Sequence, residues 1–142
     1  MTPALHALAV ELRDSGKLRW FDGMQYVEPS RRCRRPTCEK HRDLPEFDPG
    51  DTYRDRHRRT APAVVGAIPD FDDPLTAAGA LLVARAAWND PLLHVDPHRD
   101  GDDVLRWTVR GRRDGASVIL AYGAPTELEA LIAAILAAPE KK

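Results

Sequence analysis

The side chains best suited to metal chemistry lie in one short segment of the chain. Cys33 and Cys38 are separated by four residues, and His41 follows soon after them. Two thiolates and an imidazole at this spacing could supply three ligands of a tetrahedral Zn²⁺ site, and His57 could supply the fourth. Other substitutes for the fourth ligand are Asp43, Asp48 and Asp51. The spacing is unlike that of a standard zinc finger, so the alternative is two unpaired cysteines in a basic loop.

The same segment carries an excess of positive charge. Residues 31–60 hold ten Lys and Arg against six Asp and Glu, a net +4, whereas the rest of the chain carries −5. Residues 29–62 contain almost no aliphatic side chains, so we expect a long loop or insertion without its own core. Guanidinium groups bind carboxylates and phosphates, so the segment suits an acidic protein surface and a nucleic acid equally well, and a solvated loop without a partner is the other interpretation. The candidate partner-binding residues are Arg31, Arg32, Arg34, Arg35, Arg54, Arg56, Arg58 and Arg59.

Two further clusters of acidic residues have simpler explanations. Asp70, Asp72 and Asp73 precede an Ala- and Leu-rich stretch, where helix capping accounts for them. His94 and His98 lie in a Pro- and Asp-rich segment that we expect to be a loop, which either binds a hard cation weakly or is a solvated turn. Its acids are Asp96, Asp100, Asp102 and Asp103. No motif of the sequence combines a nucleophile with a base, so we expect no enzymatic activity.

Two helices are predicted at the ends of the chain from their capping residues. Thr2 suits the N-cap of the first helix, and Gly16 suits its end. In the last helix, Thr126 and Glu129 have the spacing of a capping box, and Pro139 ends the apolar stripe that follows.

A central helix is predicted between these two. Asp72 or Asp73 can cap it, and its Ala- and Leu-rich sequence continues to Trp88. The segment is apolar on almost all sides, so we expect it to be packed on two sides. Gly79 within it costs about 1 kcal/mol relative to alanine, which close packing of the helix against a sheet would compensate.

The strands are predicted from alternation and turn signals. They cover residues 18–21, 24–27, 63–68, 103–110 and 117–122, and an optional strand at 92–95 would make the second half α-β-β-β-α. Asp22-Gly23 favours the type I′ turn of one hairpin, and Asp114-Gly115 marks a second tight turn. In the strand 103–110, Leu105, Trp107 and Val109 would face the core, and the other face would carry Val104, Arg106, Thr108 and Arg110. The expected fold class is α+β: an antiparallel sheet from two hairpins covered by about three helices, in an αββ-loop-αββ(β)α sandwich.

Length and composition set the broad class of the protein. The 142 residues predict a single domain over 1–142, with 29–62 as an insertion within it. Apolar residues make up 43% of the chain, the net charge is −1, and there are only two cysteines. No apolar run is long enough for a membrane span and no signal peptide is evident, so we expect a cytoplasmic protein. The oligomeric state stays open.

Four motifs resemble a known group of proteins. They are Arg19-Trp20-Phe21-Asp22-Gly23-Met24, the run Ile68-Pro69-Asp70-Phe71-Asp72-Asp73-Pro74-Leu75-Thr76, Ala86-Ala87-Trp88-Asn89-Asp90-Pro91, and Ala124-Pro125-Thr126-Glu127. This arrangement resembles small phage and prophage proteins of the phage ABA-sandwich type, well over about residues 66–138 and loosely over 17–28. The resemblance implies a fold and no catalytic residues, because the motifs are capping and packing signatures.

The resemblance also supplies a biological context. It implies a bacterial host and a protein that binds host machinery such as transcription, restriction or CRISPR complexes. The predicted function is therefore a non-enzymatic phage accessory protein that uses its Arg-rich loop on an acidic surface of a host protein complex. The alternative is a nucleic-acid-binding module stabilised by structural zinc through Cys33, Cys38, His41 and His57.

Overall fold

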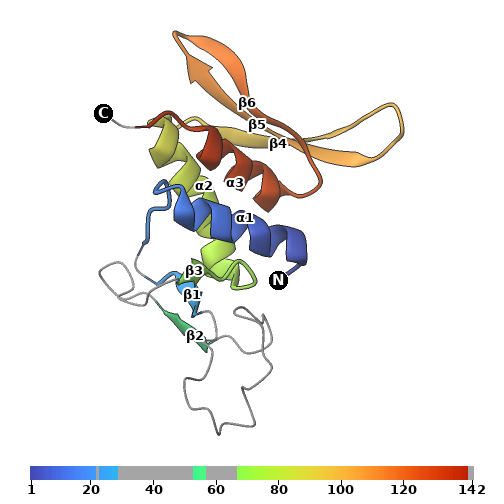
Figure 1. Cartoon of the computed structure of the whole chain (residues 1–142). Helices are drawn as coiled ribbons and strands as arrows, with labels where there is room; N and C mark the ends of the chain where they lie inside the picture. Colours follow the sequence, from blue (N-terminus) through green and yellow to red (C-terminus); the bar gives the residue numbers. More distant parts are fainter. Residues whose placement is uncertain (22, 29–52, 57–66, 141–142) are drawn as a thin grey trace, which may run out of the picture.

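The computed structural model describes residues 1–21, 23–28, 53–56 and 67–140. Three helices and six strands follow one another along these residues (Figure 1). They are α1 (Pro3–Asp14), β1 (Gln25–Glu28), β2 (Tyr53–Arg56), β3 (Ile68–Pro69), α2 (Pro74–Trp88), β4 (His94–Arg99), β5 (Leu105–Arg113), β6 (Ala116–Ala124) and α3 (Glu127–Ala137). The predicted α+β class is confirmed.

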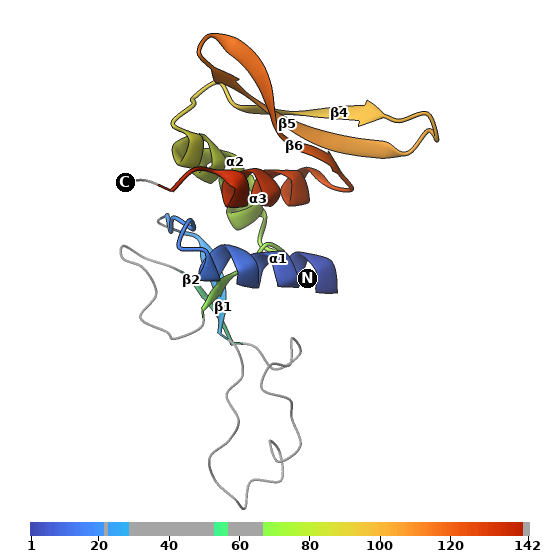
Figure 2. The ribbon, with the colours of Figure 1, turned by 45° about the horizontal axis from the view of Figure 1, so that its top comes forward.

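The strands form two separate antiparallel sheets instead of the one sheet that we expected. The first sheet has the order β2-β1-β3, and the second has the order β4-β5-β6. α3 contacts all three strands of the second sheet, and it also contacts α1 and α2. The helices therefore lie between the two sheets, and one face of the second sheet points away from them (Figure 2).

The helix boundaries follow the capping chemistry predicted from the sequence. The three N-caps are Thr2, Asp73 and Thr126. Asp73, rather than Asp72, caps α2, because its carboxylate accepts hydrogen bonds from the N–H of Thr76 at 3.0 Å and from the Thr76 hydroxyl at 2.8 Å. At α3 the bonds are reciprocal: the N–H of Glu129 donates to the Thr126 hydroxyl at 3.1 Å, and that hydroxyl donates to the Glu129 carboxylate at 2.8 Å.

The first predicted hairpin does not form. Residues 18–21 contain no strand, and β1 instead pairs with β2 on one side and β3 on the other. The local turn is present, since Gly23 has φ +90° and the N–H of Met24 donates to the carbonyl oxygen of Phe21 at 3.1 Å. Leu18 and Phe21 both pack against the core. A strand would place these two side chains on opposite faces, so the segment adopts an irregular conformation that buries both.

The segment predicted as a loop over 29–62 contains part of the first sheet. The backbone of β2 pairs in antiparallel register with β1, with Gln25 opposite Arg56 and Val27 opposite Arg54. The edge strand predicted at 63–68 appears as β3, which begins at Ile68; residues 63–66 lie outside the described part of the chain. Some of the basic segment is therefore anchored to the scaffold by backbone hydrogen bonds.

α2 is packed on two sides and leaves a third, apolar side exposed. It contacts α3, and Gly79 lies against the ring of Phe21. Ala80 and Val83 are buried in the core, whereas Leu75 is 51% exposed and Leu82 is 64% exposed. A helix that is apolar all round does not indicate which of its faces stays exposed.

The second hairpin forms as predicted and is longer than expected. Asp114 and Gly115 have φ values of 51° and 79°, the two positive angles that a type I′ turn requires. β4 extends the hairpin to a third strand, in which Val95 pairs with Val109 of β5. Both valines contribute to the core, together with the buried side of α3.

Candidate functional site

One face of the β4-β5-β6 sheet points away from the helices (Figures 1 and 2), and the register of β4 and β5 places a cluster of polar side chains on it. The antiparallel register aligns His94 with Arg110, Asp96 with Thr108, and His98 with Arg106. Val95 and Val109 alternate with these residues and belong to the core. Successive side chains of a strand point to opposite faces, so the six polar residues share the other face. We call this surface the outer face; it also includes Ile119 and Tyr122 of β6.

Two aspartates organise the charges of the outer face. In the first group, the carboxylate oxygen Oδ2 of Asp96 lies 3.2 Å from His94 Nε2 and 3.3 Å from Arg110 Nε. All three side chains are about half exposed, between 41% and 53%. Solvent screens ion pairs of this kind, so they add little to the free energy of unfolding. Their effect is to hold the guanidinium and imidazole groups in defined positions.

The second group repeats this arrangement around Asp100. Its Oδ2 accepts a hydrogen bond from Nε of Arg106 at 3.1 Å, and its Oδ1 lies 3.3 Å from His98 Nε2. Arg106 also lies 3.9 Å from the carboxylate of Asp102. Each arginine of the outer face therefore has an acidic neighbour. The surface offers donors and acceptors side by side instead of the excess of cations that phosphate binding favours.

The centre of the outer face is aromatic. The rings of Tyr122 and His98 lie 5.3 Å apart at an angle of 30°, and the Thr108 hydroxyl lies 3.3 Å from His98 Nδ1. Tyr122 is 66% exposed and Ile119 is 52% exposed. An exposed tyrosine and an exposed aliphatic side chain among positioned Arg and Asp residues have the composition of a protein-binding surface, in which Tyr and Arg are enriched.

The sequence prediction for this region was wrong in one respect. β4 begins at His94, inside the optional strand at 92–95, and it continues through His98, where we expected a loop that is either a cation site or a solvated turn. Pro97 argued against a strand, but proline is tolerated at a sheet edge, where β4 lies. Among the described residues, no group of three or more His, Cys, Asp and Glu side chains could hold a metal ion. The alternation of His and Asp with a period of two was the signal for a strand.

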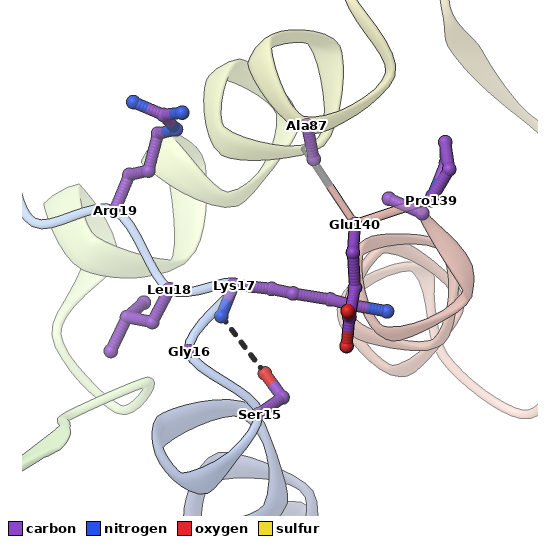
Figure 3. Close-up of a pocket in the computed structure, with 9 residues that line it drawn as sticks. Ser15, Gly16, Lys17, Leu18, Arg19, Ala87, Pro139 and Glu140 are labelled. Carbon is purple, nitrogen blue, oxygen red and sulfur yellow. Dashed lines mark hydrogen bonds between the residues drawn. The ribbon is translucent and has the colours of Figure 1, made fainter. Parts of the chain in front are cut away.

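A cavity of about 470 Å³ lies where the C-terminal ends of α1 and α3 approach Ala87 of α2 (Figure 3). The ammonium group of Lys17 donates to the carbonyl oxygen of Leu136 in the last turn of α3, and the Lys17 N–H donates to the Ser15 hydroxyl at 3.1 Å. Lys17 thus acts as a C-terminal cap. Carbonyl oxygens at helix C-termini repel anions, and the polar groups of Lys17 and Ser15 serve the ends of α3 and α1 here.

Most of the residues predicted from the sequence to form a site lie outside the described residues. This is true of Arg31, Arg32, Arg34, Arg35, Arg58 and Arg59, and of the metal candidates Cys33, Cys38, His41 and His57. The backbone of Arg54 and Arg56 belongs to β2. The Arg-rich surface and the structural zinc site therefore stay predictions.

The outer face is the strongest candidate site in the part of the chain that the structure describes. None of the helices described there is both long and apolar enough to cross a membrane. No family model, no curated protein and no solved structure matches the chain.

Proposed function

We propose that the protein is a non-enzymatic accessory protein of the phage type, which binds a protein component of a host macromolecular machine such as a transcription or defence complex. The observation that carries this proposal is the outer face, where Tyr122 is 66% exposed beside Arg and His side chains that Asp96 and Asp100 hold in place. The resemblance of residues 66–138 to phage proteins supports the context. The basic segment 31–60 would extend the contact toward acidic groups of the partner.

The pairing of the arginines favours a protein partner over a nucleic acid. Arg110 lies 3.3 Å from Asp96, and Arg106 lies 3.1 Å from Asp100. A phosphate that approaches either guanidinium group also approaches a carboxylate, and the two anions repel each other. A protein surface can instead offer an acid to the arginine and a donor to the aspartate, so it can satisfy both members of each pair.

Tyr122→Ala tests the outer face directly. Tagged protein is captured from host cells, the bound proteins are identified by mass spectrometry, and the affinity for the purified partner is measured by calorimetry. Truncating an aromatic side chain at the centre of an interface costs about 2 kcal/mol or more, so we expect the dissociation constant to rise about 30-fold. Leu82→Ala is the matched control, because Leu82 is as exposed as Tyr122 but lies on α2, and it should leave the affinity unchanged.

Three results would contradict the proposal or part of it. Equal affinities of Tyr122→Ala and the wild type for the partner would show that the outer face is not the binding surface. Recovery that disappears after nuclease treatment and falls steeply with salt would instead identify a nucleic acid as the partner. Equal recovery by a variant with alanine at Arg31, Arg32, Arg34 and Arg35 would remove the role of the basic segment while leaving that of the outer face.

A further inference from the structure

Strand β6 is an edge of the second sheet. The order β4-β5-β6 leaves one side of β6 without a partner strand among the described residues, and no further backbone hydrogen bond joins residues 116–124 to another described element. The strand reads Ala-Ser-Val-Ile-Leu-Ala-Tyr-Gly-Ala, so its nine residues include no charged side chain and no proline. An exposed edge of this length and composition is a template for pairing with another strand.

The opposite edge of the same sheet shows how such pairing is normally prevented. β4 contains Pro97 and the polar or charged residues His94, Asp96, His98 and Arg99. Proline removes a backbone donor, and charged side chains make strand addition costly. In β6 the register shifts lie beyond Ile119, so residues 116–119 form a regular stretch of edge strand that carries neither a proline nor a charge. This stretch of β6 is therefore less protected against strand addition than β4.

The hydrogen-bonding groups that such a partner would use can be located from the register. Arg113 and Ala116 flank the two-residue turn and form its hydrogen-bonded pair. Hydrogen-bonded and non-hydrogen-bonded pairs alternate along an antiparallel ladder, so Ser117 and Ile119 direct their N–H and C=O groups away from β5. Two residues in the half of β6 next to the turn therefore present a donor and an acceptor each to the outside.

We propose that the occupant of this edge is a second copy of the chain, with the two β6 strands antiparallel and related by a two-fold axis. The second sheets of the two copies then form one continuous six-stranded sheet. Two-fold pairing places the same strand on both sides of the interface, so an uncharged strand meets an uncharged strand. With the axis near Ile119, this 52% exposed side chain packs against its counterpart. This inference is independent of the function proposed above.

The charges at the two ends of β6 favour a second copy in this orientation. The hairpin end carries Arg112 and Arg113 with a single acid, Asp114, whereas the other end leads into the first turn of α3 with Glu127 and Glu129. Antiparallel pairing brings the net positive end of each copy beside the net negative end of the other, twice in the dimer. Parallel pairing would place like charges together.

The mass of the protein in solution provides the first test. We expect sedimentation equilibrium to give twice the chain mass of 15.8 kDa for the wild type. Ile119→Lys places two ammonium groups next to each other at the axis, so it should raise the dimer dissociation constant by more than about tenfold. Leu82→Lys is the matched control, since it adds the same charge at a similarly exposed apolar residue on α2 and should leave the dimer intact.

Amide hydrogen exchange shows whether β6 is the contact. In the dimer the N–H groups of Ser117 and Ile119 are hydrogen-bonded, so they should exchange slowly. Ser117→Pro should break the dimer, because proline removes an outward N–H donor that the pairing with β5 does not use. Unchanged thermal unfolding of the hairpin would show that these variants still fold. A monomeric wild type, or a dimer in which both amides exchange rapidly, would overturn the proposal. His98→Ala changes the outer face from β4, the opposite edge strand, so it should weaken partner binding and leave the dimer intact. Failure of the dimer and failure of partner binding are therefore distinguishable.

Discussion

Gly79→Ala is expected to destabilise the protein, although alanine is the better helix former. A Cβ atom at residue 79 would lie 2.2 Å from Cζ and 2.4 Å from Cε1 of the Phe21 ring. Phe21 is packed against the core and α2 is fixed by its own cap, so neither partner can move away without loss of contacts. Overpacking costs about 1–3 kcal/mol, and distances this short belong at the upper end. The gain in helix propensity offsets at most about 1 kcal/mol, so we expect a net loss of about 2 kcal/mol.

Urea denaturation of a double-mutant cycle separates the two effects. In the Phe21→Ala background the added methyl group has space, so Gly79→Ala should be neutral or stabilising there. Ala78→Gly, at the exposed neighbouring residue, reports the propensity term alone, about 1 kcal/mol. A Gly79→Ala variant that is more stable than the wild type would show that Phe21 does not occupy the space above this glycine.

The cost of Gly79 was visible in the sequence, but its partner was not. A glycine inside an Ala-rich helix predicts a close approach by some other element, and we expected packing against a sheet. The close neighbour is Phe21, which belongs to the irregular segment before β1. Local propensity shows that a contact must exist, whereas tertiary structure decides which element makes it.

Caps and tight turns were predicted correctly because their chemistry is local. Thr126 and Glu129 bond to each other within one helical turn, and Asp114-Gly115 supplies its own positive φ angles. The first hairpin failed for the opposite reason. Its turn is present at Gly23, but the partners of β1 come from residues 53–56 and 68–69, and no local signal reports a pairing over that distance.

The outer face could be predicted only in part. We expected Arg106, Thr108 and Arg110 to share one side of a strand, and they do. Their neighbours from β4 and β6 depend on register, and the ladder between β5 and β6 shifts between Trp107 and Arg110. A shift of one residue turns a side chain to the other face, so the contact between Tyr122 and His98 follows from tertiary structure and not from a motif.

Asp90→Asn is expected to loosen the hairpin that carries both the outer face and the β6 edge. Asp90 is buried, with its carboxylate accepting hydrogen bonds from the N–H of Arg112 at 2.7 Å and from the N–H of Leu92 at 2.9 Å. Gly111 makes this approach feasible, since a Cβ there would lie 3.0 Å from the Asp90 carboxylate. In Asp90→Asn, an NH₂ group replaces the oxygen that faces Arg112. This NH₂ group and the backbone N–H of Arg112 are both donors, so a buried N–H loses its hydrogen bond.

The pH dependence of thermal unfolding identifies the charge of Asp90 as the stabilising feature. The backbone hydrogen bond from Arg112, and then that from Leu92, lower the pKa of Asp90 below its ordinary value. A carboxyl group whose pKa is lower in the folded state contributes stability above its unfolded pKa, and that contribution is lost as the pH falls through the folded pKa. At pH 7 the midpoint temperature of unfolding should therefore be several degrees higher for the wild type than for Asp90→Asn. This difference in midpoint temperature should disappear as the pH falls below about 4, where carboxyl groups bind protons.

Asp14→Asn is the matched control for this experiment. Arg13 lowers the pKa of Asp14 too, through a side-chain hydrogen bond at 2.8 Å, but Asp14 is exposed at the end of α1, where solvent screens the pair. The control should show almost no difference from the wild type at either pH, and its hairpin amides should exchange at the wild-type rate. Asp90→Asn should accelerate exchange in β5 and β6 near their turn, because the carboxylate joins the end of α2 to Arg112, close to the turn of the hairpin. An equal response of the two variants would mean that Asp90 does not anchor the sheet.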